Sequence, residues 1–189
     1  MTELAIQLSE QLHERLALIY REHFAFVHRS LRRLGVPEHA LDDACQDVFL
    51  VAARRLDDFE GRSSMKTWLF GIAMRVVRSH RRSAWRHRRK VDALAAAAPL
   101  LRPVSERPHA RQDAQRTLAQ LLAELGEEQR SIYVLVELEG LSAVEVARGF
   151  GLNVNTVYTR LRAARAGLRR AAERLQSEHA ADAAGEEER

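Results

Sequence analysis

The segment Leu141–Arg170 constrains the fold of this chain more than any other stretch. Ser142 and Glu145 form the Ser-x-x-Glu pattern of a capping box, in which both side chains bond free backbone amides at the start of a helix. Gly151 suits the left-handed conformation that ends a helix, and Asn153 is a preferred first residue, or N-cap, of the next one. The segment therefore predicts a helix-turn-helix.

The second helix of this motif has an apolar stripe at helical spacing, formed by Val154, Val157, Leu161, Ala164 and Leu168. Its other faces carry polar, aromatic and cationic side chains, namely Asn155, Thr156, Tyr158, Thr159, Arg160, Arg162 and Arg165. Such side chains bond phosphates and base edges, and the major groove of DNA admits one helix. We predict that this helix binds duplex DNA. The alternative is an arginine-rich solvated helix within an ordinary helical bundle.

Charge clusters matter more here than the formal net charge of +4, because 30% of the residues are charged. One basic run contains no acid and comprises Arg78, Arg81, Arg82, Arg86, Arg88, Arg89 and Lys90. The second helix of the motif, with its extension through Arg174, forms another basic segment. Two basic segments separated in the sequence indicate two contacts on a polyanion.

The hydrophobic pattern predicts an all-α fold, because apolar residues recur at helical spacing and no stretch shows sustained strand alternation. The expected helices span about residues 5–34, as one helix or a broken pair, and 37–56, 64–85, 110–124, 127–138, 142–149 and 153–174. We expect two small helical domains, at residues 1–87 and 110–175. They are joined by a flexible linker, 88–109, which holds three of the four prolines. Residues 176–189, rich in alanine and glutamate, are expected to be disordered.

The second expected helix has an acidic outer face, opposite its apolar stripe, formed by Asp43, Gln46, Asp47 and Leu50. An acidic face is unsuited to nucleic acid, so it indicates a basic protein partner. A plain solvated helix face remains the alternative.

The following loop and the third helix place aromatic rings among cations, at Phe59, Arg62, Lys66, Trp68, Arg75, Arg78 and Arg82. Single-stranded nucleic acid needs a charged track for its backbone and flat faces for its exposed bases. We predict such a site here, with Trp68 at least partly structural. The alternative for each ring is a place in the core.

Other chemistry is not indicated. Cys45 is the single cysteine and lies on an apolar helix side, so we expect a buried thiol rather than a redox or metal residue. The sequence has no Gly-rich phosphate loop, His-x-x-x-His pair or Gly-x-Ser-x-Gly elbow, so we expect no enzyme activity, metal or cofactor. Without a membrane-length apolar run or a signal-peptide segment, we expect a cytoplasmic protein with no membrane insertion.

Two parts of the chain resemble bacterial RNA polymerase sigma factors of the extracytoplasmic-function group, within the sigma-70 family. Their second conserved region is similar to residues 43–82, DACQDVFLVAARRLDDFEGRSSMKTWLFGIAMRVVRSHRR. Their fourth region is similar to residues 125–170, LGEEQRSIYVLVELEGLSAVEVARGFGLNVNTVYTRLRAARAGLRR. The likeness covers most of residues 15–85 and 118–172, with a linker where larger sigma factors carry a third region.

The resemblance implies a factor that binds core RNA polymerase, recognises the −10 and −35 elements of promoter DNA and stabilises promoter melting. It assigns polymerase docking to the acidic face, at Asp43, Gln46, Asp47 and Leu50. It assigns −10 DNA contacts to Phe59, Arg62, Lys66, Trp68, Arg75, Arg78 and Arg82. It assigns −35 contacts to Asn155, Thr156, Tyr158, Thr159, Arg160, Arg162 and Arg165. An anti-sigma factor that covers both domains is a further expected partner.

Three positions depart from the common pattern of that family. Gly71 stands where an arginine is frequent and Arg75 where an asparagine is frequent, so no −10 preference is assigned. Tyr158 replaces a cation and exchanges a phosphate or guanine contact for a ring that can touch a thymine methyl. The rival hypotheses are a free-standing helix-turn-helix regulator that binds DNA as a dimer, and a purely helical interaction protein.

Overall fold

The computed structural model describes residues 2–92 and 110–187, with side chains described for residues 14–81 and 114–177. All regular elements in these ranges are helices, which confirms the predicted all-α class. The chain divides into two compact units, Met1–Ala96 and Ala97–Arg189, and each is described by itself. None of the helices described is both long and apolar enough to cross a membrane.

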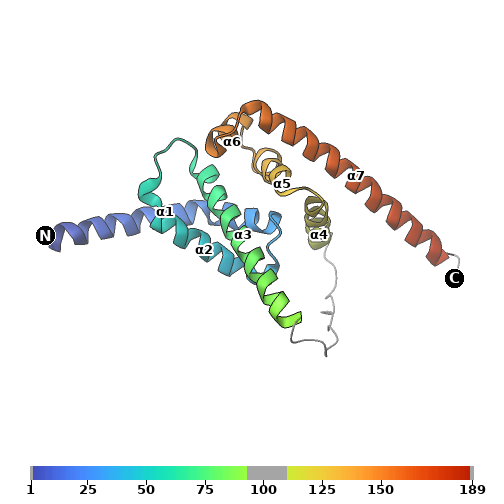
Figure 1. The fold of residues 1–189 in the computed structure, drawn as a ribbon, viewed down its shortest axis with the longest axis horizontal. Helices are drawn as coiled ribbons and strands as arrows, with labels where there is room; N and C mark the ends of the chain where they lie inside the picture. Colours follow the sequence, from blue (N-terminus) through green and yellow to red (C-terminus); the bar gives the residue numbers. More distant parts are fainter. Residues whose placement is uncertain (1, 93–109, 188–189) are drawn as a thin grey trace. The chain divides into compact units, whose positions relative to one another are not determined.

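The first unit packs three long helices against one another: α1 (Thr2–Arg33), α2 (Leu41–Arg54) and α3 (Met65–Asp92) (Figure 1). A 3₁₀ turn, η1 (Glu38–Ala40), precedes α2, and another, η2 (Leu56–Asp58), follows it. Each helix turns an apolar stripe inward. The core includes Val27, Leu31, Leu41, Ala44, Cys45, Val48, Leu69, Phe70, Ala73 and Val76. Burial of these stripes holds the bundle together.

Two polar devices fix the helix ends of this unit. Gly35 has φ 89°, and the amide of Val36 bonds the carbonyl of Leu31 at 3.1 Å, which ends α1 as predicted. At the start of α3, the Ser64 hydroxyl accepts the Thr67 amide at 3.2 Å. The end of α1 and the cap of α3 set the directions in which the chain enters α2 and α3.

The second unit comprises α4 (Ala110–Ala123), α5 (Glu127–Tyr133), η3 (Val134–Leu138), α6 (Ala143–Phe150) and α7 (Val154–Glu187). Helix α7 packs on α4, α5 and α6 (Figure 1). Its predicted stripe is confirmed at Val157, Leu161 and Ala164, which are at most 4% exposed. The expected helix 127–138 is continuous, but η3 is a single π-helical turn that the sequence pattern did not reveal.

Two predicted helix ends were wrong. Helix α3 continues past residue 85 to Asp92, because no glycine or proline stands between Arg86 and Asp92 to break it. Helix α7 continues through residues 176–187, where we expected disorder, because this alanine-rich stretch has high helix propensity. Residues 93–109 of the expected linker lie outside the described residues.

Candidate functional site

The acidic face of α2 combines carboxylates with an exposed apolar side chain. Asp43, Gln46 and Leu50 are exposed and share one side of the helix because they are three and four residues apart. Leu50 keeps 48% of its surface accessible. We refer to Asp43, Gln46, Asp47 and Leu50 together as the docking face. Buried residues on the other side of α2 hold this face outward.

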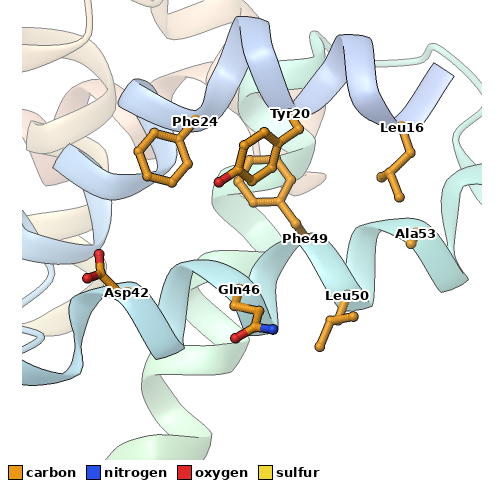
Figure 2. Close-up of a pocket in the computed structure, with 8 residues that line it drawn as sticks. All are labelled: Leu16, Tyr20, Phe24, Asp42, Gln46, Phe49, Leu50 and Ala53. Carbon is orange, nitrogen blue, oxygen red and sulfur yellow. The ribbon is translucent and has the colours of Figure 1, made fainter. Parts of the chain in front are cut away.

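An open groove of about 550 Å³ adjoins the docking face, between α1 and α2. Figure 2 shows Leu16, Tyr20 and Phe24 projecting from α1 toward α2, with the ring of Phe49 beside that of Tyr20. The Tyr20 and Phe49 ring centroids are 4.7 Å apart. The remaining lining residues are Asp42, Gln46, Leu50 and Ala53, so two docking-face residues also border the groove. A partner on this face would therefore meet carboxylates beside an apolar surface.

Asp47 differs from the rest of the docking face because it is bonded within the protein. Its Oδ2 lies 2.7 Å from Nε2 of His80, which comes from α3, and the aspartate side chain is 50% exposed. The next residue, Arg81, donates to the Leu34 carbonyl at the end of α1 at 2.8 Å. Helix α3 is thus fixed by polar contacts to both neighbouring helices. The His80 contact could not be predicted from local sequence patterns, because the two residues are 33 positions apart.

The loop before α3 places two rings together. The centroids of Phe59 and Trp68 are 5.2 Å apart with planes inclined by 51°, and both side chains are half-buried. Gly61 turns the loop with φ 69°, and Arg62 pairs with Glu60 at 2.8 Å while remaining 80% exposed. The Trp68 ring therefore packs against Phe59, and part of the Phe59 surface remains accessible.

The cations predicted near these rings have different surroundings. The Lys66 ammonium lies 5.8 Å from the Phe26 ring centroid, on the side of α3 that meets α1. Arg75 and Arg78 are exposed and share one face of α3 because they are three residues apart. The side chain of Arg82 lies outside the described residues.

The helix-turn-helix has the predicted caps. Ser142 Oγ accepts the Glu145 amide at 3.2 Å, and the Glu145 carboxylate accepts the Ser142 amide at 2.8 Å, which closes the capping box. Gly151 ends α6 with φ 63°. Asn153 Oδ1 accepts the Asn155 amide at 2.8 Å at the start of α7. These bonds fix the angle at which α7 leaves the turn.

The predicted DNA-contacting residues of α7 fall into two groups. One group is exposed along a single helix side and comprises Asn155, Tyr158, Thr159 and Arg162, which we call the recognition face. Tyr158 is 54% exposed there. Thr156 is half-buried at the margin of this face. The recognition face presents amide, phenol, hydroxyl and guanidinium groups together, which suits base edges in a major groove.

The second group consists of arginines bonded to acids of the same unit. Arg160 pairs with Glu128 of α5 at 2.8 Å, and Arg165 bonds Glu137 of η3. The Arg160 side chain is 28% exposed. Neither acid was a candidate from the sequence, because each pair joins residues about thirty positions apart. Arg160 and Arg165 thus flank the recognition face with their charge already partly compensated.

Cys45 is fully buried in α2, and burial, with a smaller effect of Asp42, raises the pKa of its thiol to about 11. The described part of the chain contains no cluster of three or more histidine, cysteine or acidic side chains that could hold a metal ion.

Residues 19–87 match the family described as Sigma-70 region 2, and residues 115–168 match Sigma-70, region 4. The RNA polymerase sigma factor NccH of Alcaligenes xylosoxydans xylosoxydans is 30% identical over 155 residues, which cover 79% of this chain and 82% of NccH. The ECF RNA polymerase sigma factor SigM of Mycobacterium tuberculosis is 30% identical over 154 residues, which cover 80% of this chain and 74% of SigM.

The protein belongs to the extracytoplasmic-function group of the sigma-70 family.

A solved structure of such a factor has the same fold. CnrH of Cupriavidus metallidurans, in complex with the cytosolic domain of CnrY, superposes with a TM-score of 0.65. The sequences are 26% identical in that superposition, which covers 90% of this chain and 95% of the other. The first unit holds region 2 and the second holds region 4. The protein is therefore a sigma factor that directs RNA polymerase to promoters and not an enzyme, and the hypothesis of a free-standing dimeric regulator is set aside.

Proposed function

We propose that this sigma factor uses three separate surfaces: the docking face for core polymerase, the loop and α3 for the −10 element, and the recognition face of α7 for the −35 element. The observation that carries the proposal is the exposure of Asn155, Tyr158, Thr159 and Arg162 along one side of a capped helix. These groups offer base-edge contacts, whereas the docking face is acidic and repels a DNA backbone. The two faces therefore serve different partners.

The −10 surface combines Phe59 and Trp68 with the cations Arg62, Lys66, Arg75 and Arg78. Arg82 is part of the same proposal from its place in the sequence. A half-buried Phe59, held by Trp68, offers a flat face to an unpaired base, and the exposed arginines follow the strand backbone. Unstacking a base costs a few kcal/mol, and binding of the flipped base offsets that cost. Melting then needs no ATP hydrolysis.

On the −35 side, Arg160 is proposed to contact a base and Arg165 a phosphate. Both bond glutamates in the free protein, so DNA binding must share or replace these bonds. Thr156 lies at the margin of the recognition face, where its hydroxyl can reach the DNA backbone. Neither of these glutamate bonds involves the recognition face, where the Thr159 hydroxyl donates to the Asn155 carbonyl at 2.9 Å and can still accept a hydrogen bond from DNA.

We further propose that an anti-sigma factor regulates this protein in the cytoplasm, where core polymerase and promoter DNA are found. CnrH was solved in complex with the cytosolic domain of CnrY, so a protein with this fold binds a second protein. The acidic docking face and its apolar groove suit a basic, amphipathic segment of such a partner.

Charge reversal tests the docking assignment. Asp43→Arg places a cation on the docking face, so a basic polymerase surface is repelled and core affinity falls by about tenfold or more. Glu173→Arg, at an acid on α7 that is also exposed, is the matched control and leaves core affinity unchanged. Affinity is measured by titrating core polymerase against fluorescently labelled full-length protein. Equal behaviour of the two variants would contradict the assignment.

A further inference from the structure

The contact between His80 and Asp47 joins a helix proposed to approach promoter DNA to the face proposed to bind polymerase. His80 Nε2 and Asp47 Oδ2 are 2.7 Å apart, with side chains 35% and 50% exposed. The contact lies at the interface where α2 and α3 pack together. It is therefore built on the rigid part of region 2 and not on a loop.

The part of α3 that carries His80 is held in place by neighbouring contacts. Arg81 bonds the Leu34 carbonyl at 2.8 Å, and Val76 and Val77 are buried one turn earlier. Asp47 itself lies between buried Val48 and exposed Gln46, so its helix position is fixed but its side chain reaches the surface. A bond from a fixed histidine then selects one rotamer of the aspartate. Within residues 14–81, Oδ1 of Asp47 accepts no hydrogen bond.

We propose that His80 is a positioning residue for polymerase docking: it holds Asp47 through Oδ2 and leaves Oδ1 for a cation of the polymerase. This inference rests on the proposed docking face. A side chain that is ordered before binding loses less conformational entropy on binding. The histidine therefore raises polymerase affinity without touching polymerase.

A double-mutant cycle tests this role, with core-polymerase affinity of the full-length protein as the readout. His80→Ala is expected to weaken binding about three- to tenfold in the natural background. The same change is expected to have no further effect when Asp47 is already alanine, because nothing remains to position. His80→Gln, which keeps a donor, is expected to restore most of the loss. Ser79→Ala, an exposed neighbour on α3, is the control and leaves affinity unchanged.

A second variant guards against a change in stability alone. His80→Glu puts a like charge beside Asp47 and is expected to weaken binding more than His80→Ala, again without effect in the Asp47→Ala background. Unfolding midpoints of all variants are measured in parallel. Because both residues are partly exposed, alanine at either position leaves no buried charge behind.

The outcomes separate this inference from the docking assignment. Additive losses, or an unchanged affinity for His80→Ala while Asp47→Ala weakens binding, would overturn the positioning role alone. Asp47→Ala without effect, while Asp43→Arg still weakens binding, would also overturn it and leave the docking face standing. If neither Asp43→Arg nor Asp47→Ala changes the affinity, the proposed docking face itself fails.

Discussion

At the scale of single residues, the arginines of α7 have unequal surroundings. Arg160 bonds Glu128 and is 28% exposed, whereas Arg162 is exposed on the recognition face. A hydrogen bond to a carboxylate orients a guanidinium. The carboxylate's negative charge also weakens the attraction of the pair for a phosphate. Residue type and spacing predicted these candidates. The acids that bond them could not be predicted, because the pairing depends on how distant helices pack.

Arg160→Ala tests the base contact. Loss of a bidentate contact to guanine costs about 1–3 kcal/mol and relaxes the choice of base at one upstream position. Binding of the full-length protein to a library of duplexes measures both effects. Glu128→Gln is the matched control, since it removes the ion pair but keeps the guanidinium and is expected to preserve selectivity. A uniform loss over all sequences would identify Arg160 as a phosphate contact instead.

Cys45 gives a prediction with a defined pH dependence. With a pKa of about 11, the folded thiol is about one-thousandth ionised at pH 8, so iodoacetamide is expected to react far more slowly than in denaturant. The unfolded thiol, with its ordinary pKa of 9.0, ionises first as pH rises. The thiol's contribution to stability is thus complete below pH 9 and is lost by about pH 11. Rapid alkylation of the folded protein at pH 8 would contradict the buried placement.

At the scale of elements, the helix-turn-helix was predictable because the residues that start and end its helices are close together in the sequence. A serine, a glutamate three residues later, a glycine and an asparagine determine where α6 and α7 begin and end. The far ends of α3 and α7 were not predictable, because nothing in those stretches actively stops a helix. The π-helical turn at Val134–Leu138 was missed since its residues also suit an ordinary helix.

Removal of the capping box tests its contribution. Ser142→Ala loses the bonds of Ser142 Oγ with the Glu145 amide and carboxylate, at 3.2 and 2.7 Å, so region 4 is expected to lose about 1 kcal/mol of stability. Thermal unfolding followed by circular dichroism measures the change. Ser177→Ala, an exposed serine late in α7 that bonds the Glu173 carbonyl, is the control. Equal midpoints for the two variants would show that the cap adds nothing.

At the scale of the whole molecule, two motifs in order determine the function. A helix-turn-helix alone occurs in many regulators, and an acidic helix face alone is often only solvated. Together, in a chain whose parts match regions 2 and 4, they identify a sigma factor. The promoter sequence does not follow from these motifs, because base choice depends on individual side chains, and Tyr158 and Arg75 depart from the common family pattern at two proposed contact positions.

Transcription in vitro tests the central claim most directly. Core RNA polymerase of the host is incubated with a pool of promoter-sized fragments of the host's DNA, with and without this protein. We predict new transcripts that require the protein, are lost with Asp43→Arg, and start downstream of shared −10 and −35 sequences. The absence of such transcripts, together with sequence-specific duplex binding that needs no polymerase, would contradict the account.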